Sequence, residues 1–323
     1  MSVGYRLLRH HGAMYRAIAS LLLHTAFPRR RDGSAAVGAS RSASAASTGE
    51  SAAAGKNLPP AAGPSASAAA LAVERTIAPP AKSLVKRYIA WCGAEGRYAK
   101  DLPPHMVSQW GLPLVGKLLL QLPYRLTSVI NQGVTLTVNG PLPRGVPLRV
   151  KASLQSVEEV AGRAKVVVAI STGTTQQDNL VEALLHMCFI LPGKRPPKSE
   201  QARPPEPQWQ NVGSWQADER DGLRFSLLTG DFNPIHWCSP LARRSVFKGK
   251  VLHGFGSLVR SYEALQPGVF NRIDVRFVKP VPLPSGPLQV ELAPADATDS
   301  FPLRLTSAGG SVVHFIGHCN RAA

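Results

Sequence analysis

From residue 81 onward the sequence repeats one order of apolar patterns. Each half opens with a face of apolar residues at helical spacing and continues with runs that alternate as strands do. The two helical faces begin about 140 residues apart, as do the first strand-like runs behind them. They consist of Leu112, Val115, Leu119 and Leu122, and of Leu252, Phe255, Leu258, Val259, Tyr262 and Leu265. One helix followed by several strands, twice, predicts an α+β protein in which curved antiparallel sheets wrap long helices.

The repeat and the composition between its halves predict the domain organisation. Residues 81–195 form a first domain and residues 210–323 a second, joined by a Pro-, Lys- and Gln-rich linker over residues 196–209. With 323 residues and 44% apolar content, the chain is large enough to bury a substantial core.

The net charge of +17 is unevenly distributed. Residues 203–323 contain 13 Lys/Arg and 10 Asp/Glu, so most of the positive excess lies upstream. Nucleic-acid binding would need basic residues clustered on one element with aromatics between them, and no such stripe occurs. The charge is better explained by a leader and by an anionic ligand, such as a coenzyme A phosphate or an acidic carrier protein.

Four cysteines stand far apart in the sequence, without a CxxC pair: Cys92, Cys188, Cys238 and Cys319. This spacing argues against a disulfide framework and against a zinc site. We expect free thiols that pack as small apolar side chains in a reducing compartment.

Residues 1–80 have the composition of a disordered leader. No acidic residue precedes Asp32, six arginines do, and residues 33–70 are rich in Ala, Ser, Gly and Pro. An Arg- and Ser-rich, acid-poor leader predicts a mitochondrial transit peptide. A secretory signal is an alternative, but His24 and the arginines at 29–31 fit its cleavage region poorly. A third interpretation is an extension without a targeting signal, which would leave the protein cytoplasmic.

The run from Thr229 to His236 reads TGDFNPIH and carries a candidate acid/base pair. Asp231 and His236 stand five residues apart on a turn that Gly230 tightens and Pro234 stiffens. A carboxylate and an imidazole held around one water molecule can orient the water and move its proton near neutral pH.

Two further residues complete the candidate site. Asn233 can hydrogen-bond the loop backbone or polarise a partner. Gly254 begins the second long helix, where a backbone N–H without an intrahelical acceptor can face a developing anion. An acid/base pair beside such a donor suits proton chemistry next to a carbonyl, and the sequence therefore predicts an enzyme.

These residues also have purely structural interpretations. Asp and Asn before a proline commonly satisfy the local backbone in turns and caps. His253 is expected to pack or to cap the helix. For His314 and His318, on one strand, solvent exposure or core hydrogen bonding is favoured over a metal pair.

The second half resembles a known family. The run FSLLTGDFNPIH at 225–236, followed by VLHG at 251–254, resembles the signature of MaoC-like R-specific enoyl-CoA hydratases and 3-hydroxyacyl-thioester dehydratases. The segment 274–281 also resembles the strand that follows the family's central helix, and the match covers about residues 208–320. This resemblance implies two tandem hot-dog folds. The first is degenerate, because residues 91–96, which correspond to the Asp231 loop, lack its pattern.

The resemblance implies an activity in fatty acid metabolism. It implies interconversion of trans-2-enoyl and (R)-3-hydroxyacyl thioesters, with Asp231 and His236 as the catalytic dyad, Asn233 as its support and Gly254 as the oxyanion donor. No metal or redox cofactor is implied. The degenerate half is expected to form a tunnel for the acyl chain.

Several alternatives remain open at this stage. Arg243, Arg244 and Lys250 belong either to a solvated loop or to a contact with coenzyme A phosphates. A hot-dog thioesterase and a non-catalytic acyl-binding subunit are the rival functions. The sequence does not choose between coenzyme A and carrier-protein substrates, or decide whether two chains form a homodimer.

Overall fold

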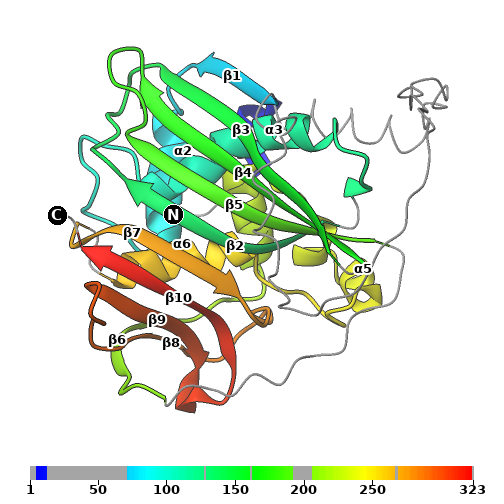
Figure 1. Cartoon of the computed structure of the whole chain (residues 1–323), viewed down its shortest axis with the longest axis vertical. Coiled ribbons are helices and arrows are strands. Elements are labelled where there is room, and N and C mark those ends of the chain that lie inside the picture. Colours follow the sequence, from blue (N-terminus) through cyan, green and yellow to red (C-terminus); the bar gives the residue numbers. More distant parts are fainter. Residues whose placement is uncertain are drawn as a thin grey trace, which may run out of the picture.

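The computed structural model describes residues 5–12, 71–126, 129–160, 162–191, 206–265 and 268–321. Within these residues, one antiparallel ten-stranded sheet has the order β1-β3-β4-β5-β2-β7-β10-β9-β8-β6. Helices α2, α3 and α6 lie together on one face of it (Figure 1). None of the helices in the described part is long and apolar enough to span a membrane. The α+β class and the tandem hot-dog architecture are confirmed.

The described part of the chain begins with a short 3-10 helix, η1 (Tyr5–His10). The first half then comprises β1 (Ala72–Ile77), α2 (Lys82–Cys92), η3 (Pro104–Met106), α3 (Val107–Leu119), β2 (Val129–Val138), β3 (Leu148–Val160), β4 (Arg163–Thr174) and β5 (Val181–Ile190). The second comprises β6 (Gln210–Trp215), α4 (Asp221–Thr229), η5 (Pro234–His236), α5 (Ser239–Arg244), α6 (Gly254–Ala264), β7 (Phe270–Phe277), β8 (Leu288–Leu292), β9 (Ser300–Ser307), η6 (Ala308–Gly310) and β10 (Val313–Arg321).

The two halves share one topology. The strand order β1-β3-β4-β5-β2 in the first half matches β6-β8-β9-β10-β7 in the second, read from the edge of the sheet to its centre. Corresponding strands begin about 140 residues apart, as the sequence pattern predicted. The halves join where β2 pairs with β7, from Gly133 opposite Arg276 to Thr137 opposite Arg272.

The structure differs from the predicted leader in two stretches. Strand β1 lies inside residues 1–80 and pairs with β3 along its whole length. In η1, Leu7 is buried, and the ring of His11 donates from Nε2 to the Leu227 carbonyl at 2.7 Å. The prediction of disorder is wrong for these stretches. Residues 13–70 lie outside the described residues, as does most of the predicted linker at 196–209.

The helices form because their apolar faces are buried against the sheet. The predicted face of α6 is buried, including Leu258 and Tyr262. On α3 the prediction is only partly right: Val115 is buried as predicted, but Leu118 is buried where the predicted Leu112 is only partly buried. Each fully buried side chain of this size contributes about 1.5–3 kcal/mol. The buried faces of α3 and α6 belong to one hydrophobic core that includes residues of both halves, so their burial stabilises the two halves together.

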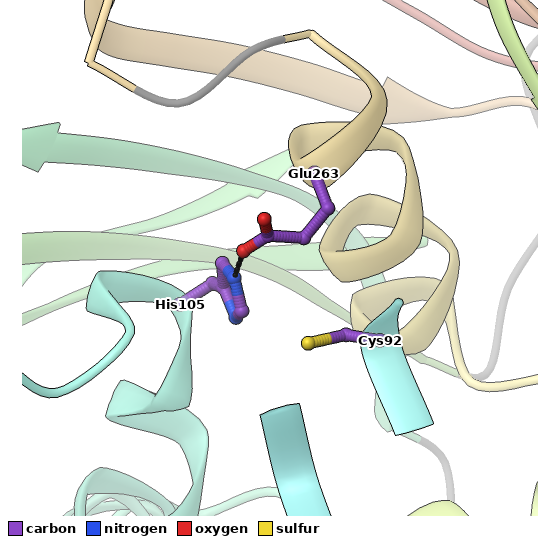
Figure 2. Close-up of side chains that lie close together, drawn as sticks. All are labelled: Cys92, His105 and Glu263. Carbon is purple, nitrogen blue, oxygen red and sulfur yellow. Dashed lines mark hydrogen bonds and ion pairs between the residues drawn. The ribbon is translucent and has the colours of Figure 1, made fainter. Parts of the chain in front are cut away.

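A buried carboxylate links α6 to the first half. Figure 2 shows Glu263 on α6 pointing toward His105 of η3, with Cys92 of α2 beside them. The His105 Nε2 lies 2.6 Å from Glu263 Oε1, Tyr98 donates to the same oxygen at 2.7 Å, and Arg97 Nη1 lies 2.8 Å from Oε2. The carboxylate of the second half is thus held by three groups of the first.

Cys92, His105 and Glu263 are also of the types that bind metal ions, and their ligand atoms lie within 4.8 Å of one another. Their bonding capacity is already used within the protein. The Cys92 thiol donates to the Ile89 carbonyl, and burial raises its pKa, which opposes the thiolate form that a metal needs. An ion would also meet the Arg97 guanidinium. The arrangement therefore fits a structural network better than a metal site.

Replacing Glu263 with Ala is expected to lower the free energy of unfolding by about 3–5 kcal/mol, because the buried His105 and the part-buried Tyr98 lose their acceptor. Glu263→Gln keeps an acceptor and should cost less. Denaturant unfolding monitored by circular dichroism measures both. Glu158→Ala, which removes an exposed pair with Lys165, is the control and should change stability by less than about 1 kcal/mol. A loss for Glu263→Ala equal to that of the control would contradict the role of the network.

Candidate active site

A cavity of about 340 Å³ lies between the halves, and it contains the sequence-predicted catalytic residues. Its size is that of a small-molecule site. The first half contributes the start of β2, and the second contributes the loop after α4, the start of α6 and the end of β7. The lining includes Val129, Ile130, Asn131, Asp231, Asn233, His236, His253, Gly254, Phe277, Lys279, His314 and Phe315.

The end of α4 aims Asp231 at this cavity. The helix stops at Thr229 because Gly230 adopts a left-handed conformation at φ 85°, which glycine tolerates best. The N–H of Gly230 donates to the Ser226 carbonyl at 2.8 Å, and the N–H of Asp231 donates to Thr229 Oγ1 at 3.3 Å. These bonds fix the direction in which the chain leaves the helix.

The loop that follows also uses ordinary turn chemistry. Asp231 Oδ1 accepts from the N–H of Asn233 at 3.3 Å, and Asn233 Oδ1 accepts from the N–H of Ile235 at 3.3 Å, which caps η5. The prediction that Asn233 supports the loop backbone agrees with this geometry. The second carboxylate oxygen of Asp231, Oδ2, is directed toward the ring of His253, 3.9 Å from its Nε2. The turn and the candidate catalytic site therefore share the same carboxylate.

The imidazole of His236 is buried with one nitrogen fixed. Its Nδ1 lies 2.7 Å from the Val251 carbonyl, which can only accept, so Nδ1 carries the proton. In the neutral ring Nε2 is then unprotonated and able to act as a base. Burial lowers the pKa of His236, while the Asp231 carboxylate opposes the shift. A side chain at Gly222 would meet the His236 carbonyl at 1.9 Å, so glycine there lets α4 approach this residue.

His253 was expected to pack or to cap α6, and it packs. It occupies the position before the helix but makes no side-chain capping bond. Its ring stacks on that of His236, with centroids 3.6 Å apart and planes inclined by 27°. Its Nε2 donates to the Asp231 carbonyl at 3.1 Å. Burial lowers the pKa of His253 well below its ordinary value, and the neighbouring His236 adds to the shift.

Gly254 is the first residue of α6 and lines the cavity. The first N–H groups of a helix have no intrahelical acceptor, so they are available to a ligand. A bond from the Leu252 N–H to the Val281 carbonyl, at 2.8 Å, fixes the segment that leads into the helix. A methyl group on Gly254 would lie 2.8 Å from the Phe277 ring, so the close packing here requires glycine.

The structure separates the predicted phosphate contacts from the cavity. Arg243 and Arg244 are exposed on α5, and Lys250 pairs with Glu219 at 2.9 Å. None of these three basic residues is among the cavity-lining side chains, whereas Lys279, which the sequence interpretation did not select, is.

The two histidines of β10 behave as expected for structural residues. His314 is buried and lies within 3.0 Å of Ser307 Oγ and 3.2 Å of the Pro280 carbonyl, while His318 is exposed. A bulge between Val313 and Phe315 interrupts the strand's alternation, so a sequence count from 314 to 318 could not place their side chains. His314 lines the cavity, and no pattern in the sequence indicated this position.

The cavity brings together three groups with different chemical properties. An unprotonated ring nitrogen, a carboxylate and a helix-terminal N–H border the same space. The first two can hold and deprotonate a water molecule, and the third can stabilise an oxyanion. The rest of the lining is largely apolar, which suits a substrate with a hydrocarbon part.

Comparisons with known proteins agree with this fold. Residues 194–306 match the family model described as MaoC like domain. The solved structure of HtdX from Mycobacterium tuberculosis is 18% identical, with a TM-score of 0.64 over 78% of this chain and 100% of that chain. A MaoC-like dehydratase from Phytophthora Capsici is 15% identical, with a TM-score of 0.62 over 80% and 98%.

The fold is also similar to that of a protein with a different named activity. An acyl-ACP thioesterase from Bacteroides thetaiotaomicron is 8% identical, with a TM-score of 0.50 over 78% of this chain and 98% of that chain. No curated protein matches the sequence. Fold similarity alone therefore does not separate a dehydratase from a thioesterase. The two activities have to be distinguished by the side chains that line the cavity.

The free energy of unfolding is expected to fall as the pH drops below about 6.5. His236 and His253 have lowered pKa values when folded, so the unfolded chain binds protons that the folded chain does not. Stability is then present above the unfolded pKa and lost as the pH falls, by up to about 1.4 kcal/mol per pH unit for each proton. Denaturant titrations between pH 7 and pH 5 measure the slope. His253→Phe should flatten it, and equal slopes in the two proteins would contradict the assignment.

Proposed function

We propose that this chain is a hydro-lyase that adds water to trans-2-enoyl thioesters and removes it from (R)-3-hydroxyacyl thioesters. The match of residues 194–306 to the MaoC like domain model supports this proposal. The observation that carries the proposal is the convergence of His236, Asp231 and Gly254 on one cavity. The stereochemical assignment and the role in fatty acid metabolism rest on the family resemblance.

The proposed reaction divides the work among these three groups. The Asp231 carboxylate and the His236 Nε2 hold a water molecule, and the ring accepts its proton as the oxygen bonds to C3 of the enoyl group. The electron pair of the double bond moves onto the thioester oxygen, where the N–H of Gly254 stabilises the enolate. Return of the electron pair to C2, with delivery of the proton there, completes the hydration. Dehydration runs through the same steps in reverse.

The thiol half of the substrate is proposed to be coenzyme A or a carrier protein. Lys279 at the cavity and the exposed Arg243 and Arg244 on α5 provide positive charge for phosphate groups. The acid-poor sequence before Asp32 supports a mitochondrial location as part of the same proposal. No metal or redox cofactor takes part in these steps.

A coupled assay tests the proposal against thioester hydrolysis. Hydration removes the conjugated enoyl absorbance without releasing thiol, whereas a thioesterase releases thiol. We expect the first result with enoyl-CoA or with an enoyl carrier protein. Asp231→Asn should lower the turnover of that reaction on the order of 10²- to 10⁴-fold while the fold survives, because the carboxylate no longer activates water.

Asp274→Asn is the matched control for that substitution, since Asp274 lies on β7 and pairs with Arg276 and Thr135 away from the cavity. Its turnover should stay near that of the wild type. Near-wild-type turnover of Asp231→Asn would remove Asp231 from the mechanism. Substrate binding without turnover in the wild-type protein would favour a non-catalytic acyl-binding role.

The kcat/KM for hydration is also expected to rise from four-carbon to longer enoyl substrates. The first half provides the apolar side chains of Val129 and Ile130 to the cavity, and each methylene buried there contributes up to about 0.8 kcal/mol. Values of kcat/KM across an enoyl-CoA series measure this. Ile130→Trp should narrow the cavity and reduce the values for long chains more than for the four-carbon substrate. Highest activity on the four-carbon substrate would contradict a tunnel formed by the first half.

A further inference from the structure

The ring of His253 does more at the cavity than an apolar side chain could. Its side chain is 3% exposed, and it lies against the ring of His236 with a centroid separation of 3.6 Å. A leucine or phenylalanine would fill comparable space. Its Nε2, however, is directed at Asp231 and its ring lies on His236, and these are the two side chains proposed to act on the water molecule.

The first contact of His253 is with the loop. Its Nε2 lies 3.1 Å from the Asp231 carbonyl, and since a carbonyl only accepts, Nε2 carries the proton. The same nitrogen lies 3.9 Å from Asp231 Oδ2. One N–H therefore ties the start of α6 to the residue whose carboxylate is proposed to hold the water. Its Nδ1 is buried without a hydrogen-bond partner among the described residues, so the polar contacts of the ring are made through Nε2.

The second contact is with the base. His236 is fixed at Nδ1 by the Val251 carbonyl, but that bond still lets the ring tilt. Stacking against His253 restrains the tilt and so sets the direction of Nε2. When His236 accepts a proton, it becomes a cation in contact with the His253 ring. A charged His253 would repel it, and burial, which lowers the pKa of His253 well below its ordinary value, keeps that ring neutral.

The elements around His253 hold its ring in place. On the side of α4, Phe225 packs with its ring centroid 4.9 Å away, and Ser226 Oγ lies 3.5 Å from Nε2. Behind Phe225, the ring of Trp91 from α2 lies at 4.9 Å. Among the described residues, the titratable groups in charge or ring contact with His253 are Asp231 and His236. An aromatic chain thus runs from the first half to the candidate base.

We propose that His253 is a positioning residue for the hydration reaction: it orients His236 through ring stacking and the Asp231 loop through its Nε2–H. The proposal rests on the proposed function for its kinetic consequences. It acts through the two neighbouring residues and requires no contact of its own with the substrate.

Variants of the full chain separate the two contacts. His253→Phe keeps a ring for stacking and loses the N–H donor, His253→Gln keeps a donor and loses the ring, and His253→Ala loses both. We expect His253→Ala to lower kcat on the order of 100-fold, since misplacing a reacting group by about 1 Å can cost that much, with KM within about threefold. Phe and Gln should each recover at least about threefold over Ala. His186→Gln on β5, away from the cavity, is the control for a His-to-Gln change.

A second measurement does not depend on the substrate. The pKa of His236 can be followed by NMR titration of its ring protons in each variant. His253→Ala should raise it toward the ordinary value because water reaches the ring, whereas His253→Phe should keep it low. If the His253→Ala variant does not fold, the His253→Phe and His253→Gln variants are compared with each other instead.

The outcomes distinguish the two proposals. A wild-type protein that does not hydrate enoyl thioesters overturns the proposed function, and the titration still decides on His253. An unchanged His236 pKa in His253→Ala, or in Gln if Ala does not fold, overturns the positioning role. A kcat within about twofold of wild type in His253→Ala, or a loss confined to KM, overturns it as well.

Discussion

The pairing of β2 with β7 is the interaction on which the rest of the molecule depends. It merges two five-stranded units into one sheet and brings the start of β2 beside the end of β7. The cavity forms at this junction, with side chains from both halves. Neither half alone would enclose it. The Glu263 network then fixes the end of α6 against η3 and the loop that follows α2 in the first half.

Within this frame, the candidate site relies on preorganisation. The loop after α4 is held by a helix stop at Gly230 and by two Asx-type bonds within the loop, and by His253 from the start of α6. The cost of ordering these groups is met during folding, so little reorganisation is left for the reaction itself. Burial also keeps both histidines neutral at rest. A neutral His236 is ready to accept a proton, and a neutral His253 does not oppose that charge.

The sequence pattern predicted α6 and β7 to β10 better than it predicted the edge strand β1 and the helix α4. The apolar periodicity of α6 and the alternation in β7 to β10 were strong enough to place these elements correctly. Strand β1 was missed because it follows a low-complexity tract, and its six residues include Glu74 and Arg75, which face solvent on an edge strand. Helix α4 was missed because its sequence was interpreted as part of a motif. Only long-range pairing with β3, from Ala72 opposite Ser153 to Ile77 opposite Leu148, decides that 72–77 is a strand.

By itself, the sequence determined the repeated architecture and predicted four residues that line the cavity: Asp231, Asn233, His236 and Gly254. It could do so because local spacing and turn chemistry act over a few residues. Tertiary structure alone decided which distant groups meet there: His253 against His236, Ile130 from the other half, and Lys279 instead of Lys250 at the rim. These contacts depend on strand register and on the packing of α6 against two halves. Such relations are set by the whole core, and no window of neighbouring residues encodes them.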